Sequence, residues 1–239
     1  MEQAITQKRQ RLPERHEKKY WINQGDMLAL RQKLLPALEH DEHADKYGRY
    51  FIRSLYFDDA ANSAYYDKQD GVPERDKYRI RIYNLSDRVI FLERKRKMGN
   101  LIQKSSCRIS RELTQALIAG DASALLGMED PLLKDMYFEM RHKLLRAKVL
   151  VDYTREAYVH PIENVRITFD TQLATCPGSV DLFNKNLLCV SPLDDAREIL
   201  EIKYDRYLPD YISSLLYDTP TEYCAISKYV LCRRFEPLM

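Results

Sequence analysis

The chain has 239 residues, of which 45% are hydrophobic and 31% are charged, and its formal net charge is +2. This length suits one large domain, and the charged fraction exceeds the quarter that is usual in soluble proteins. A net charge so near zero excludes a globally basic nucleic-acid coat protein, so we expect no nucleic-acid partner and only local positive fields.

The sequence carries no targeting or membrane signal. Its N-terminus lacks the apolar segment of a signal peptide, and no apolar run is long enough to cross a bilayer. The five cysteines are odd in number and lack CxxC spacing, which argues against a disulfide framework or a structural zinc site. We therefore expect a soluble protein in the reducing cytoplasm. The cysteines are Cys107, Cys176, Cys189, Cys224 and Cys232.

The first third of the chain predicts two strands, a packing helix and a flexible start. We expect residues 1–13 to be a flexible segment and residues 14–239 to form a single domain. Alternating charge predicts a strand over Arg15–Ile22, and helical spacing of leucines predicts a helix over Asp26–Leu38, with Asp26 as its N-cap. A second strand follows over Tyr50–Phe57, and then a polar helix or turn over Ala60–Asp67.

The stretch Asp76–Lys97 predicts a hairpin with one charged face. Its two strands flank a turn at residues 84–87, and side chains alternate between the faces of each strand. Arg79 and Arg81 therefore share a face of the first strand, as Glu93 and Lys95 do in the second. A further strand, Leu101–Ser110, follows the Gly99-Asn100 turn.

The rest of the chain predicts two helices, three strands and two short helices. Ser110 caps a helix to about Ala119, and Pro131 opens a helix over Leu132–Leu145. The strands are Lys148–Tyr158, Arg166–Thr171 and Ile199–Tyr204, and the short helices are Pro209–Tyr217 and Ser227–Phe235.

The same charged face recurs in six or more of these strands. An ordinary sheet with one wet face explains the pattern as well as a barrel whose charged side chains point inward. About nine cations inside a barrel would repel one another strongly, so such an interior needs anions and water. The barrel interpretation predicts a polyanionic ligand, and the interspersed carboxylates predict a divalent metal beside it.

Eight segments in order resemble the VTC domain, a member of the triphosphate tunnel metalloenzyme (CYTH-like) superfamily. They are RHEKKYW at 15–21, SLYFD at 54–58, KYRIRIY at 77–83, FLERKRK at 91–97, DYTREAY at 152–158, RITFDT at 166–171, LEIKYD at 200–205 and SKY at 227–229. The resemblance covers roughly residues 14–235. It implies an α+β fold: a closed, antiparallel, eight-stranded barrel with a charged bore and packing helices outside.

The resemblance also implies site residues. Those expected to contact phosphate in catalysis are Lys19, Arg79, Arg81, Lys95, Arg155 and Arg166. Those expected to bind the substrate chain are Lys104, Tyr153, Lys203, Ser227 and Lys228, with Lys203 inferred from its face of the strand. Glu201 matches the metal-binding glutamate of the family, and Glu93 and Glu17 are the candidates to assist it.

The motif of the first strand differs between subfamilies of the superfamily. Tunnel enzymes that hydrolyse triphosphate or cyclise ATP resemble ExExK at the first strand, whereas this chain has R-x-E-x-K, from Arg15 to Lys19. Exchanging a carboxylate for a cation favours one catalytic metal and one more phosphate contact, and it argues against a two-metal hydrolase.

The resemblance implies a polyphosphate polymerase that transfers the γ-phosphate of ATP to a growing polyphosphate chain, using Mn²⁺ or Mg²⁺. Its partners would be ATP or another triphosphate, and inorganic polyphosphate. Related eukaryotic proteins carry membrane spans that this chain lacks, so a separate membrane protein that receives the product is a further expected partner, at the inner face of the membrane. The alternatives are an inorganic triphosphatase of the same fold and a non-catalytic polyphosphate-binding module.

Overall fold

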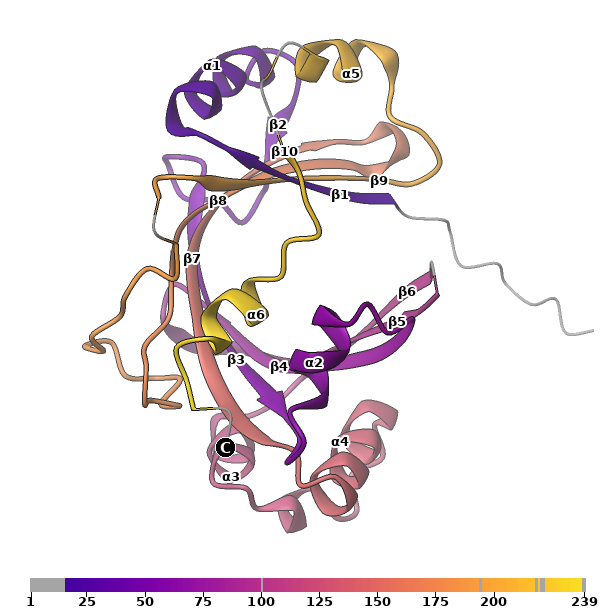
Figure 1. Cartoon of the computed structure of the whole chain (residues 1–239), viewed down its shortest axis with the longest axis vertical. Helices are drawn as coiled ribbons and strands as arrows, with labels where there is room; N and C mark the ends of the chain where they lie inside the picture. Colours follow the sequence, from indigo (N-terminus) through magenta and orange to yellow (C-terminus); the bar gives the residue numbers. More distant parts are fainter. Residues whose placement is uncertain (1–15, 100, 194, 218, 220–221, 238–239) are drawn as a thin grey trace, which may run out of the picture.

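The structure is a computed structural model (Figure 1), and it describes residues 16–99, 101–193, 195–217, 219 and 222–237. The predicted flexible segment and Arg15 lie outside these residues. The strands are β1 (His16–Ile22), β2 (Glu39–His40), β3 (Arg49–Asp58), β4 (Glu74–Tyr83), β5 (Ser86–Met98), β6 (Leu101–Arg108), β7 (Arg146–His160), β8 (Val165–Ala174), β9 (Glu198–Tyr204) and β10 (Glu222–Tyr223). The helices are α1 (Gln24–Leu34), α2 (Ser63–Gln69), α3 (Arg111–Ile118), α4 (Pro131–His142), α5 (Asp210–Tyr217) and α6 (Lys228–Arg233), with 3₁₀ turns η1 (Ala122–Leu125) and η2 (Ile162–Asn164).

The predicted closed, eight-stranded barrel is wrong. The described strands form one antiparallel sheet of ten strands in the order β10-β1-β9-β8-β7-β3-β4-β5-β6, with β2 on β7, and the sheet is open. The short β10 pairs with Tyr20 and Trp21, and so covers part of the β1 edge that closure would need. Register shifts in β3–β7, β4–β5 and β7–β8 accompany a strong curvature, which brings β1 and β9 to face β5 and β6 (Figure 1).

Helices cover the convex face of the sheet at both of its ends. At one end, α1 and α5 bury Leu30 and Ile212 against Ile167 and Phe169 of β8. At the other end, α3, α4 and η1 pack on the apolar side chains of β4 and β5, which include Ile80 and Leu92. The helices α2 and α6 lie on the concave side, between the two ends of the sheet (Figure 1). The apolar side chains that alternate with the charges therefore point outward.

Most predicted elements are found, with shifted ends. The N-cap of α1 is Asn23, whose side chain accepts from the backbone N–H of Asp26, so the prediction of Asp26 as the cap is wrong. Ser110 and Ser227 cap α3 and α6 as predicted. The described helices include none that is both long and apolar enough to span a bilayer.

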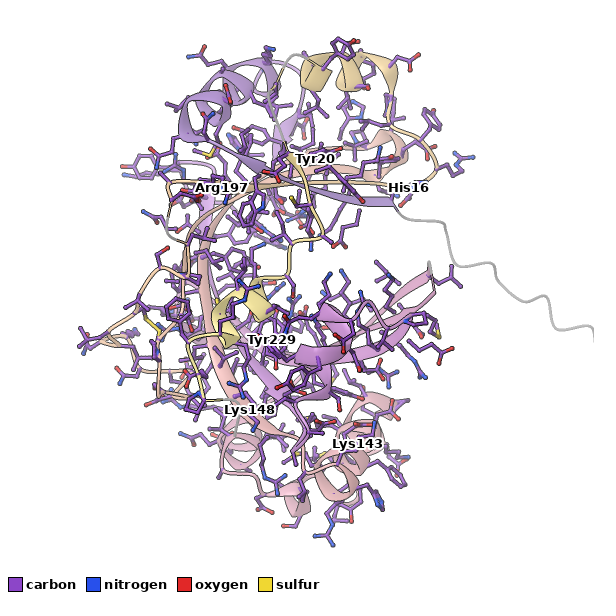
Figure 2. The ribbon with its side chains drawn as sticks, viewed as in Figure 1. His16, Tyr20, Lys143, Lys148, Arg197 and Tyr229 are labelled. Atoms are coloured by element: carbon purple, nitrogen blue, oxygen red, sulfur yellow. A yellow bond between two sulfur atoms is a disulfide. The ribbon has the colours of Figure 1, made fainter. Side chains whose placement is uncertain are left out.

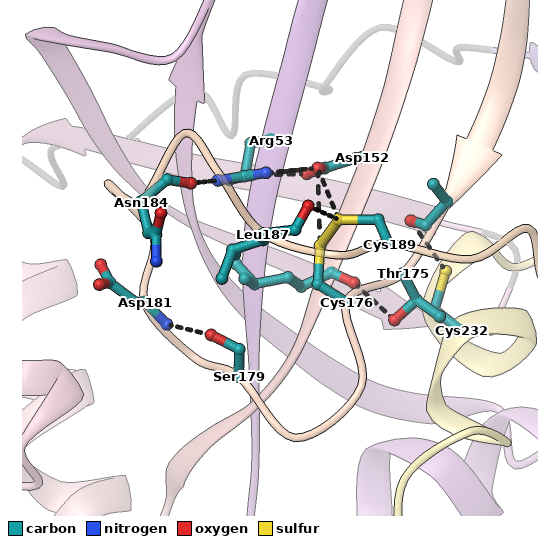
Figure 3. The surroundings of a disulfide bond; sticks show 12 residues. Arg53, Asp152, Thr175, Cys176, Ser179, Asp181, Asn184, Leu187, Cys189 and Cys232 are labelled. Carbon is teal, nitrogen blue, oxygen red and sulfur yellow. Dashed lines mark hydrogen bonds and ion pairs between the residues drawn. A yellow bond between two sulfur atoms is a disulfide. The ribbon is translucent and has the colours of Figure 1, made fainter.

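A disulfide joins Cys176 to Cys189, contrary to the expectation from the cysteine count (Figure 3). It forms because Thr175 and Val190 pair by two backbone hydrogen bonds, which places the next residues opposite each other. With Asp152, the two cysteines are the only close group of three candidate metal ligands in the described part of the chain, all within 4.8 Å. While the sulfur atoms are bonded to each other, this group offers a metal no thiolate.

Candidate functional site

The concave face gathers the charged side chains of seven strands. Strand register places Lys19 opposite Glu201, Arg155 opposite Asp170, and Arg79 opposite Glu93. Figure 2 shows side chains projecting from both ends of the sheet toward α6, which carries Tyr229. We call the following set the concave site: Glu17, Lys19, Asp41, Arg79, Arg81, Glu93, Lys95, Lys104, Tyr153, Arg155, Arg166, Asp170, Glu201, Lys203, Ser227 and Lys228.

Glu201 and Glu17 share the ammonium of Lys19. Its Nζ lies 3.0 Å from Glu17 Oε1 and 3.4 Å from Glu201 Oε1. Lys203 Nζ lies 2.9 Å from the other oxygen of Glu201. Glu17 also accepts from Lys95 of β5 at 2.9 Å, so an ion pair spans the two facing ends of the open sheet. These contacts hold the ends together by side chains where the backbone does not pair.

Glu93 forms a second group with three cations. Its carboxylate lies 2.6 Å from Arg79 Nε, 2.5 Å from Lys104 Nζ and 3.7 Å from Arg81 Nη1. Arg79 also donates to Tyr56 Oη at 2.8 Å. Each guanidinium therefore keeps donors that Glu93 does not use, and such forks suit phosphate oxygens.

Asp170 forms a third group with β7 and α6. Arg155 donates to both of its oxygens, at 2.6 and 2.7 Å, and Lys228 Nζ lies 2.5 Å from Oδ2. Arg155 Nη2 also lies 3.5 Å from Glu201, which links this group to the first.

Two further contacts complete the concave site. Arg166 pairs with Asp41 at 2.5 Å and donates to Tyr50 Oη at 2.8 Å. Tyr153 Oη accepts from Arg81 at 3.3 Å.

Positive charge exceeds negative charge in the concave site. Nine cations stand against five carboxylates: Lys19, Arg79, Arg81, Lys95, Lys104, Arg155, Arg166, Lys203 and Lys228 against Glu17, Asp41, Glu93, Asp170 and Glu201. Every carboxylate except Asp41, which pairs with Arg166, lies within ion-pair distance of two or more cations. The arrangement suits a ligand with many closely spaced negative charges.

The cations control the ionisation of the carboxylates. Burial raises the pKa of Glu17, but Lys19 and Lys95 outweigh it and bring the pKa down to about 2. Burial likewise opposes Arg155 and Lys228 at Asp170, whose pKa falls to about 2. Burial of Glu201 is also outweighed, chiefly by Lys203 and Lys19, and its pKa lies well below the usual range. All three are therefore anionic at neutral pH.

The fourteen residues predicted for the site all lie on the concave side, and their roles remain predictions. No role was predicted for Asp170, Asp41 or Tyr56, which contact Arg155, Arg166 and Arg79. Tyr56 could have been found, because it occupies an alternate position in a predicted strand. Asp41 has no such signal, since it lies outside every predicted element.

The residues present fit a divalent metal in one place. Glu17 and Glu201 are two anionic carboxylates on one cation, Lys19, and Mg²⁺-type ions bind one or two carboxylates together with substrate phosphates. Glu93 shares no cation with either of them and is held by Arg79, Arg81 and Lys104. The carboxylates that suit a metal are therefore Glu17 and Glu201.

The chain is similar to several solved structures, to different degrees. A protein from Hippeastrum, described as a candidate adenylyl cyclase with a dominant triphosphatase activity, is 17% identical with a TM-score of 0.56, over 93% of this chain and 97% of its own. A candidate adenylate cyclase from Bacillus halodurans is 11% identical with a TM-score of 0.44, over 86% and 87%. A conserved hypothetical protein from Pyrococcus furiosus is 12% identical with a TM-score of 0.42, over 85% and 86%.

The first of these neighbours shares the fold of this chain over nearly its whole length. No curated protein matches the sequence. The VTC domain family matches residues 14–235, a range that holds every residue of the concave site. The chain therefore belongs to the VTC domain family.

Proposed function

We propose that this protein is a polyphosphate polymerase, which moves the γ-phosphate of ATP onto the end of an inorganic polyphosphate chain. The observation that carries the proposal is the charge of the concave site, where nine cations share five carboxylates. A chain of phosphates supplies the missing negative charge at close spacing, and ATP offers three phosphates of the same kind. Membership of the VTC domain family supports the same proposal.

The reaction needs positioning and charge neutralisation more than a protein nucleophile. A terminal oxygen of the acceptor chain attacks the γ-phosphorus, the bond from that phosphorus to the β–γ bridging oxygen breaks, and ADP leaves with that oxygen. Arg79 and Arg81 are placed to hold phosphate oxygens through donors that Glu93 leaves free. Lys19, Lys95 and Lys104 act as point charges.

Glu201 and Glu17 are the residues that would hold Mn²⁺ or Mg²⁺. When bound, such an ion neutralises charge on the transferred phosphoryl group. The chain's own part is to keep both carboxylates anionic, which Lys19 and its neighbours do. Lys19 would then be free to turn from the carboxylates toward a phosphate.

Triphosphate hydrolysis is the second candidate function. It is favoured by the structural neighbour from Hippeastrum, which is described as having a dominant triphosphatase activity. The same cations would hold the triphosphate, and water would replace the acceptor chain. A polyphosphate-binding module without turnover is the third candidate.

One assay separates the three. The protein is incubated with ATP, Mn²⁺ and a pyrophosphate primer, and the products are resolved on a gel. Long chains are the expected result. If orthophosphate is the only product, the protein is a triphosphatase. If the ligands bind and no product forms, the protein is a binding module.

A matched pair of variants ties the product to the concave site. Arg79→Ala should abolish chain formation, because it removes a phosphate donor from the concave face. Arg96→Ala removes the same charge from the opposite face of the neighbouring strand, where Arg96 lies 3.8 Å from Asp76, and should leave the product unchanged. Equal loss of chain formation in both variants would show that the concave site has no specific part in the reaction.

A further inference from the structure

Four cations gather where α2 meets the far end of the β4–β5 hairpin. Lys68 comes from α2, Arg75 and Lys77 come from β4, and Lys97 lies opposite Arg75 on β5. All four are partly buried. We call these four residues the α2 cation cluster.

The α2 cation cluster has no carboxylate partner in the described part of the chain. Among the residues that the structure describes, none of the four forms an ion pair with Asp or Glu, whereas each of the nine cations of the concave site does. Arg75 donates to the Val72 carbonyl instead. Lys77 donates to Ser227 Oγ at 3.1 Å and lies 5.2 Å from the ring centroid of Tyr229.

The pKa values of two lysines in the α2 cation cluster are lowered. Burial lowers the pKa of Lys77 to about 7, helped by repulsion from Lys68, Arg75, Lys19 and Lys95. Burial and nearby cations, Arg75 first, also lower the pKa of Lys68. These groups come from α2, β1, β4 and β5, and the groups that α6 presents to Lys77 are the Ser227 hydroxyl and the Tyr229 ring. Burial and mutual repulsion therefore disfavour the charged forms of these lysines in the folded chain, and a bound anion would favour them.

The α2 cation cluster continues a row of cations that begins in the concave site. Arg81, Arg79, Lys77 and Arg75 occupy alternate positions of β4, so they share a face at steps of ~6.6 Å along the strand. Glu93 neutralises the end of the row at Arg81 and Arg79. No carboxylate of the residues described in the structure pairs with the end at Arg75.

We propose that the α2 cation cluster binds the phosphates of an inorganic polyphosphate chain that extend beyond the three held in the concave site. The inference rests on the proposed function, since it assumes that a triphosphate unit occupies the concave site. Arg75 lies two steps of ~6.6 Å beyond Arg79 along β4, so a triphosphate held at Arg79 and Arg81 would not reach Arg75 or its neighbour Lys97. The cluster thus distinguishes long chains from short ones.

The test compares two ligands on two double variants. Lys68→Gln/Lys97→Gln removes two charges from the α2 cation cluster and leaves the concave site intact. Arg96→Gln/Lys134→Gln removes two charges from the convex side, where the partners are Asp76 and Glu129. The affinity of each variant and of the unmodified protein is measured by calorimetry for tripolyphosphate and for long-chain polyphosphate, without ATP or metal.

We expect the cluster variant to lose affinity for long-chain polyphosphate only. The dissociation constant should rise about tenfold for each removed cation, which corresponds to ~1.4 kcal/mol each. Tripolyphosphate affinity should stay within about twofold, given that a tenfold change is ~1.4 kcal/mol. A long chain offers more binding positions than tripolyphosphate does. Each variant is therefore compared with the unmodified protein on the same ligand.

Failure of the inference and failure of the proposed function have different signatures. Unchanged long-chain affinity in the cluster variant, or equal loss for both ligands, would overturn the inference while the proposed function stands. The same loss in the convex variant would also overturn it, because the effect would then be one of net charge. If the unmodified protein binds no tripolyphosphate, the proposed function itself is wrong. A single-stranded DNA oligonucleotide that binds as tightly as polyphosphate would overturn the choice of ligand.

Discussion

Glu201 lies buried among Lys19, Arg155 and Lys203, and a structural ion pair and a metal ligand both fit that position. Glu201→Gln distinguishes them. If the carboxylate holds metal, Mn²⁺-dependent turnover should fall by orders of magnitude, because a hard divalent cation needs the anionic oxygen. Triphosphate affinity without metal should hold or rise, since the cations remain and one repulsive charge is gone. The measurement pairs calorimetry without metal with product formation in Mn²⁺.

A control for this variant lies on the same strand. Glu198 is on the opposite face of β9, and burial raises its pKa to about 7. Glu198→Gln makes the same chemical change outside the concave site and should leave turnover nearly unchanged. Full Mn²⁺-dependent activity in Glu201→Gln would contradict the role of Glu201 as a metal ligand, and Glu17 would then be the remaining candidate.

Lys77 makes stability depend on pH. Its pKa is about 7 in the folded chain and 10.5 as the unperturbed value. Between these two values the unfolded chain holds a proton that the folded chain has released, so the free energy of unfolding rises with pH in this range. Lys77→Met removes this contribution. The variant should therefore be more stable relative to the unmodified protein at pH 7 than at pH 10.

Urea unfolding at several pH values between 7 and 10 measures that difference. Other lysines of the site titrate as well, so the informative quantity is the gap between variant and unmodified protein at each pH. A gap that stays constant from pH 7 to pH 10 would show that Lys77 is charged in the folded state.

At the scale of elements, strand faces could be predicted from the sequence but their partners could not. Alternation along β4 and β5 places Arg79, Arg81 and Lys95 on one face without any tertiary information. The pairing of Lys95 with Glu17, by contrast, depends on how far the sheet curves. The Cys176–Cys189 disulfide depends in the same way on one backbone bridge between two irregular segments, which no local pattern marks.

The short helix α6 is held in the concave side by a buried polar clamp. Tyr229 donates its hydroxyl hydrogen to Asp58, and Arg233 donates to the Asn62 side chain at 2.9 Å. Because α6 carries Lys228 and follows Ser227, this clamp positions two predicted phosphate ligands.

Tyr229→Phe should destabilise the protein by about 1.5–3 kcal/mol, since it removes a hydrogen bond to a buried carboxylate. Urea unfolding measures the change. Tyr223→Phe is the control, because Tyr223 is largely exposed. An unfolding midpoint that Tyr229→Phe does not move would show that the apolar contacts of α6 hold it without the clamp.

The whole molecule departs from the closed barrel that the resemblance implied. Side-chain alternation is the same for a barrel and for a strongly curved open sheet, so the pattern could predict a charged concave face but could not decide closure. Closure of the sheet depends on whether the backbones of its edge strands can pair. β10 covers Tyr20 and Trp21 on the β1 edge, and the Glu17–Lys95 ion pair crosses between the two ends of the sheet.

This architecture predicts a large stabilisation by polyanions. A ligand that binds only the folded chain raises the free energy of unfolding by about 2.7 kcal/mol at a hundred times its dissociation constant. For a chain of this size, that is a rise of about 5–10 °C in melting temperature. Tripolyphosphate should produce such a shift by relieving repulsion among the nine cations and by bridging the two ends of the sheet. Added salt should reduce the shift, because it screens the partly exposed charges.

Thermal denaturation with and without tripolyphosphate measures this shift in the unmodified protein and in Arg79→Ala/Arg81→Ala. The double variant should show a much smaller shift, because two phosphate donors are lost from the concave site while the convex core is untouched. Sulfate at equal ionic strength controls for general anion effects. If tripolyphosphate shifts both proteins equally, it binds elsewhere, and if it shifts neither, the concave face is a solvated sheet surface whose carboxylates already satisfy its cations.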